Sequence, residues 1–223
     1  MIAEAGGDGR RRDEAFESFC RAYWYPLYAF LRRRGEAAED ARDLVQGFFL
    51  QMIEKDWLAG VEKRQTRFST LLLTVMERHL ISAYRRATAE KRGGRVTVSI
   101  DLAEAEAWFG KEPASGESPE QIFERRWALA VLAAGLQRLQ EDCQAAGRAR
   151  LFETLSPFLS REPEAGEYDT AAVALGLNRR SVAVAVHRLR RDFREMVRSE
   201  VAAGLVDPAR VDEEMRCLAA ALR

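Results

Sequence analysis

The spacing of apolar residues along the first part of the chain predicts helices. Apolar side chains recur there at intervals of three and four residues, the pattern of helices that each bury one face. The predicted helices cover residues 13–23, 27–34, 39–57 and 68–86. Pro26 is expected to break the first helix or to begin the second as a first-turn residue, because proline lacks the backbone N–H. The last helix is expected to turn Leu72, Leu80 and Tyr84 inward.

A second helical region is predicted after residue 118. Ser118 is a favourable N-cap and Pro119 a favourable first helical residue, so a long helix is expected over residues 119–145. A shorter helix is expected over residues 149–156, because the proline that follows discourages continuation. Since only residues 96–100 resemble a strand, we predict an all-α protein.

Composition divides the chain into two small helical domains joined by an acidic linker. The linker segment is rich in glycine and serine and has no helical stripe of useful length, apart from one short helical turn at residues 102–109. The predicted parts are an N-terminal domain (1–92), the linker (93–118), a C-terminal domain (119–198) and an extension (199–223). In the extension, Val211, Met215, Leu218 and Leu222 share one side of a predicted short helix.

The most specific local signal is a helix–turn–helix pattern in residues 168–197. Asp169 can cap a short helix, Gly176 can supply a left-handed turn, Leu177 is expected to point from the turn into the core, and Asn178 can cap the next helix. The side chains predicted to face inward from that helix are Val182, Val186, Leu189 and Phe193. Those predicted to face outward are Arg179, Arg180, Ser181, Val184, His187, Arg188 and Arg191. This pattern is typical of a recognition helix in a DNA major groove, and the alternative is a surface hairpin without a ligand.

Charge is distributed in blocks although the 35 basic and 35 acidic residues cancel. Residues 78–95 hold six basic residues against one acid, and residues 177–198 hold seven arginines against two acids. Between them, residues 96–124 hold seven acids against one lysine. Two basic patches on two helical units indicate two surfaces that meet a polyanion, although each patch alone could be a solvated helix face.

Several classes of protein are excluded by what the sequence lacks. Three distant cysteines without a C-x-x-C pair argue against a disulfide framework or a zinc site and fit a reducing cytoplasm. No membrane span or secretion signal is recognisable. There is no Walker A loop, H-E-x-x-H, G-x-S-x-G or clustered carboxylate metal site, so we expect neither an enzyme nor a bound metal or cofactor.

Three segments, in this order, resemble the extracytoplasmic-function (ECF) sigma factors of bacterial RNA polymerase. EDARDLVQGFFLQMIEK is similar to the D-x-x-D-L-x-Q-x-x-F segment of that family, RFSTLLLTVMERHLISAYRR to the helix that follows it, and LGLNRRSVAVAVHRLRRDFRE to the promoter-binding motif. The resemblance covers most of residues 16–92 and 119–198. It implies a cytoplasmic promoter-specificity subunit that binds core RNA polymerase and promoter DNA, recognises the minus-ten and minus-thirty-five elements and helps to melt DNA. It leaves open an anti-sigma factor or other regulatory partner.

The resemblance also assigns roles to residues of the N-terminal domain. Docking on core polymerase falls to Asp40, Asp43, Gln46 and Phe49. Contacts near the minus-ten element fall to Arg64, Gln65, Thr66 and Arg67 in a loop and to Arg78, His79, Ser82, Arg85 and Arg86 in the helix after it. For the two aspartates, the alternative is ordinary solvation or compensation of the helix N-terminal charge.

This sequence departs from the family pattern at several of these positions. Arg42 stands where an acid is usual, and Gly47 replaces the usual glutamate inside a helix. Further departures are Leu71, Arg78, Ser82 and Ala183. They leave open the promoter preference and the strength of core docking. A stand-alone dimeric helix–turn–helix regulator is the main alternative function, and an enzyme acting on nucleic acid is the more distant one.

Overall fold

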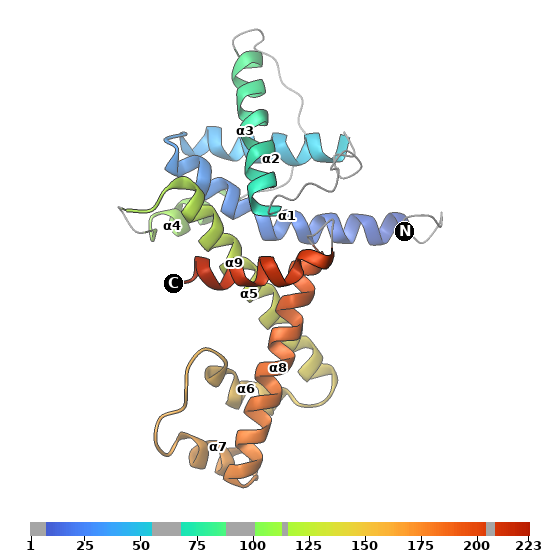
Figure 1. Ribbon diagram of the computed structural model, residues 1–223, viewed down its shortest axis with the longest axis vertical. Coiled ribbons are helices and arrows are strands. Elements are labelled where there is room, and N and C mark those ends of the chain that lie inside the picture. The colour runs from blue at the N-terminus through green and yellow to red at the C-terminus, as the bar shows by residue number, and fades with distance from the viewer. Residues whose placement is uncertain (1–7, 55–67, 88–100, 113–115, 204–207) are drawn as a thin grey trace. The chain divides into compact units, whose positions relative to one another are not determined.

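The computed structural model describes residues 8–54, 68–87, 101–112, 116–203 and 208–223. Every regular element in these ranges is helical, which confirms the all-α prediction. The strand-like residues 96–100 lie outside them. The chain divides into two units, coloured by residue number in Figure 1: unit 1 comprises Met1–Ala130 and Ala203–Arg223, and unit 2 comprises Val131–Ala202. The predicted basic helices fall one in each unit, while the domain bounds drawn from the sequence stay a prediction.

Unit 1 is built around three helices. They are α1 (Asp8–Arg33), α2 (Ala38–Glu54) and α3 (Phe68–Ala87). Helix α1 packs on α2, and α2 packs on α3. Their shared core includes the fully buried side chains of Leu27, Tyr28, Phe30, Phe48, Phe49, Leu72 and Met76.

Helix α1 runs unbroken through Pro26, so the predicted break at this residue is wrong. A proline inside a helix costs about 3 kcal/mol because one backbone hydrogen bond is lost. The neighbouring Leu27, Tyr28 and Phe30 are fully buried, and each buried side chain of this size contributes about 1.5–3 kcal/mol. The packing of these residues just after the proline therefore outweighs the local cost.

The short turn predicted at residues 102–109 is the helix α4 (Leu102–Phe109), which contacts α1 and α2. Asp101 caps it by accepting hydrogen bonds from the backbone N–H groups of residues 103 and 104, at 2.9 and 3.1 Å. Glu106 accepts two hydrogen bonds from the Arg32 guanidinium, at 2.8 and 3.0 Å, and one from the Tyr28 hydroxyl. The pKa of the Glu106 carboxyl is held below its usual range, mainly because of the hydrogen bonds from Arg32. Polar side chains thus fasten α4 to α1.

A buried carboxylate ties the end of this segment to the same unit. The Tyr25 hydroxyl donates to Glu112 Oε1 at 2.9 Å, and the Arg125 guanidinium donates to Oε2 at 2.7 Å. Arg126 makes a second ion pair with Glu112. Both arginines belong to α5 (Pro119–Ala145), which has the predicted bounds and begins with reciprocal hydrogen bonds between residues 118 and 121.

The C-terminal extension forms η3 (Pro208–Arg210) and α9 (Val211–Ala221), grouped with unit 1. Of the four residues predicted to share one side of this helix, Val211 and Leu218 are buried, Met215 is half-buried, and Leu222 is exposed because it lies beyond the last helical residue. The charged Glu214 is buried in the same helix. Burial, with a smaller effect of the Glu214 charge, raises the pKa of Tyr23, whose hydroxyl oxygen accepts a 2.7 Å hydrogen bond from the Trp127 indole.

Unit 2 contains the rest of α5 and four further elements. These are α6 (Ala149–Leu155), η2 (Ser156–Leu159), α7 (Glu167–Leu175) and α8 (Arg179–Ala203). Their apolar core joins residues of α5, α6, α7 and α8, among them Leu139, Phe152, Leu155 and Val182. None of the described helices of either unit is both long and apolar enough to span a membrane.

Candidate functional site

The predicted helix–turn–helix segment forms α7 and α8, joined by a tight turn. Gly176 adopts the left-handed conformation (φ 65°), and the N–H of residue 177 donates to the Ala172 carbonyl at 2.9 Å. Asn178 Oδ1 accepts a 2.8 Å hydrogen bond from the Ser181 N–H, which confirms the predicted cap of α8.

Two local predictions in this segment are wrong. Asp169 does not cap α7, because the helix begins at Glu167, after a left-handed Gly166, and Asp169 lies in its first turn. Leu177 is 42% exposed and does not enter the core. Backbone hydrogen bonds already close the turn, and Ala172 and Val182 fill the core on either side of it.

The recognition-type helix α8 has the orientation that its pattern predicts. Val182, Val186 and Leu189 are buried, and Phe193 packs against the same core. On the opposite face Arg179, Arg180, Val184, His187, Arg188 and Arg191 are exposed, with Ser181 half-buried. The first part of α8 therefore offers cations around one apolar side chain, Val184, which is 46% exposed.

Some of these arginines form ion pairs with nearby acidic side chains, which reduces the positive charge of the exposed face. Arg179 lies 3.9 Å from the Asp169 carboxylate. Arg191 pairs with Asp192 at 2.8 Å, and this hydrogen bond raises the pKa of its guanidinium. An open groove of about 340 Å³ beside these residues is lined by Tyr168 of α7 and by α8 side chains that include His187, Arg190, Arg191 and Arg194, of which Arg190 donates from all three guanidinium nitrogens to other residues of unit 2. Its lining suits an anionic group such as a phosphate.

The predicted docking residues of α2 fall on two different faces. Asp40 and Asp43 are exposed, and Gln46 is half-buried. Phe49 is fully buried, with its ring 6.1 Å from that of Phe19 in an edge-to-face contact. Helical spacing places residue 49 on the buried stripe, so its side chain supports this face from inside.

Arg42, where the family pattern has an acid, pairs within its own helix. Its guanidinium donates twice to Asp43, at 3.1 and 3.0 Å, and lies 2.9 Å from Glu39. The Asp43 hydrogen bonds are the main reason that the pKa of Arg42 is raised. The reversed charge thus neutralises part of the acidic face.

The predicted DNA-facing residues of α3 are also divided. Arg78 and Arg85 are exposed, and Ser82 is half-buried. His79 is buried, with Nδ1 2.6 Å from Gln51 Oε1 and its ring edge-on to Phe48. Arg64, Gln65, Thr66 and Arg67 lie outside the described residues, as does the side chain of Arg86.

Gly47, where the family pattern has a glutamate, lies next to the buried His79. A Cβ built at this position would lie 3.4 Å from His79 Nε2, which is ordinary contact distance. A methyl group at this position would therefore be in van der Waals contact with the imidazole.

Sequence reasoning missed two exposed apolar residues of α3. Ile81 lies on the same helix face as Arg78 and Arg85, and helical spacing alone could have found it. Tyr84 was predicted to point inward, but it is 51% exposed. Its hydroxyl donates to Glu36 in the α1–α2 turn, and this bond raises its pKa to about 12. The apolar pattern could not show that this end of α3 meets a polar turn.

The sequence was compared with protein-family models, with curated proteins and with solved structures. A family model described as ECF sigma factor matches residues 27–157, which include α2, α3 and α4 and end before α7. No curated protein and no solved structure matched the chain. Because the family model covers more than half of the sequence, this protein belongs to the ECF sigma factor family, whose members act in transcription initiation.

Proposed function

We propose that this sigma factor directs core RNA polymerase to a two-part promoter and helps to open the DNA there. In this proposal α8 reads the minus-thirty-five element. The observation that carries it is the exposed first part of α8, where Arg180, Val184 and Arg188 follow the Asn178 cap. Arginine forks pair with guanine, valine can contact a thymine methyl group, and helix N-termini of this kind approach base edges in the major groove.

The acidic face of α2 is proposed to dock on core polymerase. Asp40 and Asp43 are exposed there, and opposite charge on a partner would steer and orient the encounter. Phe49 would act by packing beneath this face, since its own side chain is buried.

The minus-ten element is proposed to meet α3 and the segment of residues 58–67 that precedes it. Arg78 and Arg85 are exposed beside Ile81 and Tyr84, a mixture of cations with apolar and aromatic surface that suits single-stranded DNA. Unpairing costs roughly a few kcal/mol per base, so exposed bases need such partners. We leave His79 out of this surface because its ring is buried.

Run-off transcription with core polymerase and DNA selected by the protein tests the proposal. The full chain should initiate above the level of core alone, and absence of initiation by folded protein rejects it. Asp43→Arg should lose core binding but keep DNA binding, while Glu120→Arg, at an exposed acid in the first turn of α5, is the charge-matched control and should change neither. The stand-alone dimeric regulator gains no support from the family match.

A further inference from the structure

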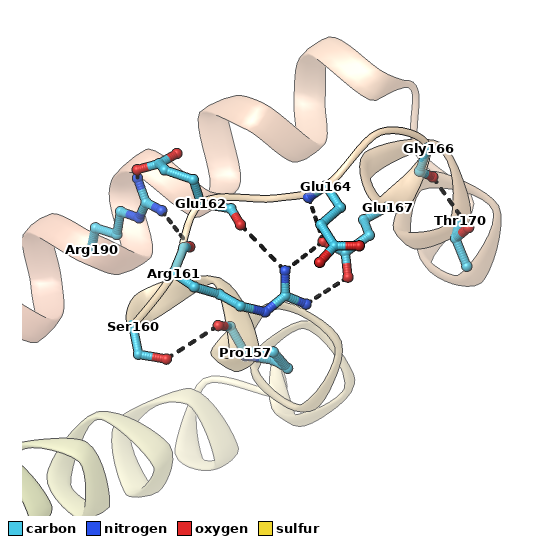
Figure 2. Close-up of polar contacts among 9 residues, drawn as sticks. All are labelled: Pro157, Ser160, Arg161, Glu162, Glu164, Gly166, Glu167, Thr170 and Arg190. Atoms are coloured by element: carbon cyan, nitrogen blue, oxygen red, sulfur yellow. Dashed lines mark hydrogen bonds and ion pairs between the residues drawn. The ribbon is translucent and has the colours of Figure 1, made fainter.

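The arginines of α8 are not equivalent, and Arg190 differs from those on the exposed face. All three nitrogens of its guanidinium donate hydrogen bonds to the segment before α7. Nε donates to the Phe158 carbonyl at 2.9 Å, Nη2 to the Arg161 carbonyl at 2.9 Å, and Nη1 to Glu162 Oε1 at 2.8 Å. Figure 2 shows Arg190 reaching from α8 to this loop.

The same loop is fastened to α7 at its other end. The Arg161 guanidinium donates to both carboxylate oxygens of Glu167, at 2.7 and 2.5 Å, as Figure 2 shows. Glu167 also accepts a 2.7 Å hydrogen bond from the Glu164 N–H. Arg161 in turn lies over the Phe158 ring, 5.5 Å from its centroid. Residues 158–167 therefore form a strap with one end on α8 and the other on the first turn of α7.

The backbone carbonyls are the partners that matter most to Arg190. The Glu162 side chain is 81% exposed, and ion pairs in such surroundings contribute little. The Phe158 carbonyl instead belongs to a residue whose side chain is buried in the core of unit 2. The guanidinium reaches the two carbonyls from two different nitrogens held in one plane, whereas a lysine would have to reach both from a single nitrogen.

We infer that Arg190 is a positioning residue that fixes α7 against α8 and does not itself bind DNA. The two helices are joined covalently at the Gly176 turn, and the strap holds the opposite end of α7. Base readout requires that the reading helix be held in place by such a supporting layer. This inference rests on the proposed DNA binding by α8, and it removes Arg190 from the count of DNA-contacting cations.

The test compares Arg190→Ala, Arg190→Lys, Glu162→Gln and Arg188→Ala in the full chain. We expect Arg190→Ala to speed amide hydrogen exchange in residues 159–167 by about tenfold or more, because three charge-assisted hydrogen bonds are lost, two of them to backbone carbonyls. Affinity for selected promoter DNA should fall by roughly tenfold, whereas affinity for unrelated duplex and the salt dependence of binding should not change. Arg190→Lys should behave similarly, and Glu162→Gln should remain close to the wild type.

Arg188→Ala supplies the contrasting behaviour of a direct phosphate or base contact. It should leave exchange in the strap unchanged and lower the slope of log affinity against log salt concentration by up to about one. The same slope change in Arg190→Ala, with normal exchange, would overturn the inference. Equal loss of affinity for both DNAs with unfolding of unit 2 would overturn it too, since Arg190 would then be merely structural.

Failure of the proposed function has its own signature. If the wild type did not distinguish promoter from unrelated DNA, the proposed reading by α8 would be rejected, and the role of Arg190 in recognition with it. The exchange measurement would still decide whether Arg190 fastens the strap, because it needs no DNA.

Discussion

The two units differ in the polar side chains that they bury. Among the described residues, the buried polar and charged side chains are Ser69, His79, Glu112 and Glu214, and all belong to unit 1. The buried cluster of unit 2 consists of apolar residues alone, and its polar side chains act at the surface. Unit 1 therefore adds buried hydrogen bonds and ion pairs to its apolar core, whereas the core of unit 2 depends on apolar packing alone.

This difference predicts which kind of substitution each unit tolerates least. A buried ion pair is costly to break because one charge stays behind without its partner. An apolar core instead loses stability through cavities and overpacking. The following substitutions test this contrast in order of expected effect.

Glu112→Ala should have the largest effect, a loss of about 3–5 kcal/mol in the stability of unit 1, because the half-buried Arg126 would lose this carboxylate and the half-buried Arg125 would keep only Glu117. All four tryptophans of the chain lie in unit 1, so urea unfolding followed by tryptophan fluorescence reports it. The exposed Glu104 of α4 provides the control, and its change to alanine should be nearly neutral. A loss below about 1 kcal/mol for Glu112→Ala would argue against a buried network in unit 1.

Val182→Ala should cost unit 2 about 2–3 kcal/mol, since two methyl groups leave a fully packed site. Val184→Ala, two residues along the same helix, is the matched control: its side chain is 46% exposed, and the change should stay within about 0.5 kcal/mol. Thermal unfolding followed by circular dichroism compares them. Equal effects would contradict the assignment of the buried face of α8.

Gly135→Ala and Gly47→Ala compare close packing in the two units. Both changes gain helix propensity, by up to about 1 kcal/mol. A Cβ at Gly135 would lie 2.8 Å from Val197 Cγ2 and 3.1 Å from the Val197 backbone nitrogen, so α5 and α8 would have to move apart. We expect a net loss of about 1–2 kcal/mol for Gly135→Ala and a small gain for Gly47→Ala, measured as shifts in melting temperature. A gain in both would show that the α5–α8 contact yields easily.

The smallest expected effect is a loss of stability in unit 2 when the pH falls and Glu167 becomes protonated. Hydrogen bonds from Arg161, followed by that from the Glu164 N–H, lower the pKa of Glu167 from 4.5 to about 2. A carboxyl with a lowered folded pKa contributes stability that is complete above 4.5 and is lost as the pH falls toward 2. Unit 2 should lose a small part of its stability in this window, and Glu167→Gln should abolish that dependence. An NMR titration of Glu167 with its midpoint near the usual value would refute it.

Local signals in the sequence located most of the helices because caps and periodicity act over a few residues. The bounds of α5 follow from Ser118 and Pro119, and the start of α8 follows from Gly176 and Asn178. The orientation of Val182 and its neighbours in α8 could be predicted for the same reason.

Contacts between distant segments could not be predicted in this way. Glu106 pairs with Tyr28, 78 positions away in the sequence, and with Arg32, 74 positions away. No local sequence pattern predicts contacts over such separations. His79 looks like a DNA-facing residue by type, yet tertiary packing against Gln51 encloses it. The use of Arg190 to hold a loop was hidden for a related reason, since a run of arginines gives no sign of which ones have intramolecular partners.

Unit 1 is assembled from both extremes of the chain, and this has a practical outcome for trimming and digestion. A polypeptide that ended at residue 198 would lack the buried side chains Val211, Glu214 and Leu218 of unit 1. The residues that pack against them would then be exposed to solvent. The chain passes from unit 1 to unit 2 and returns to unit 1, so two covalent connections join the units. A protease that cuts one of these connections would release neither unit.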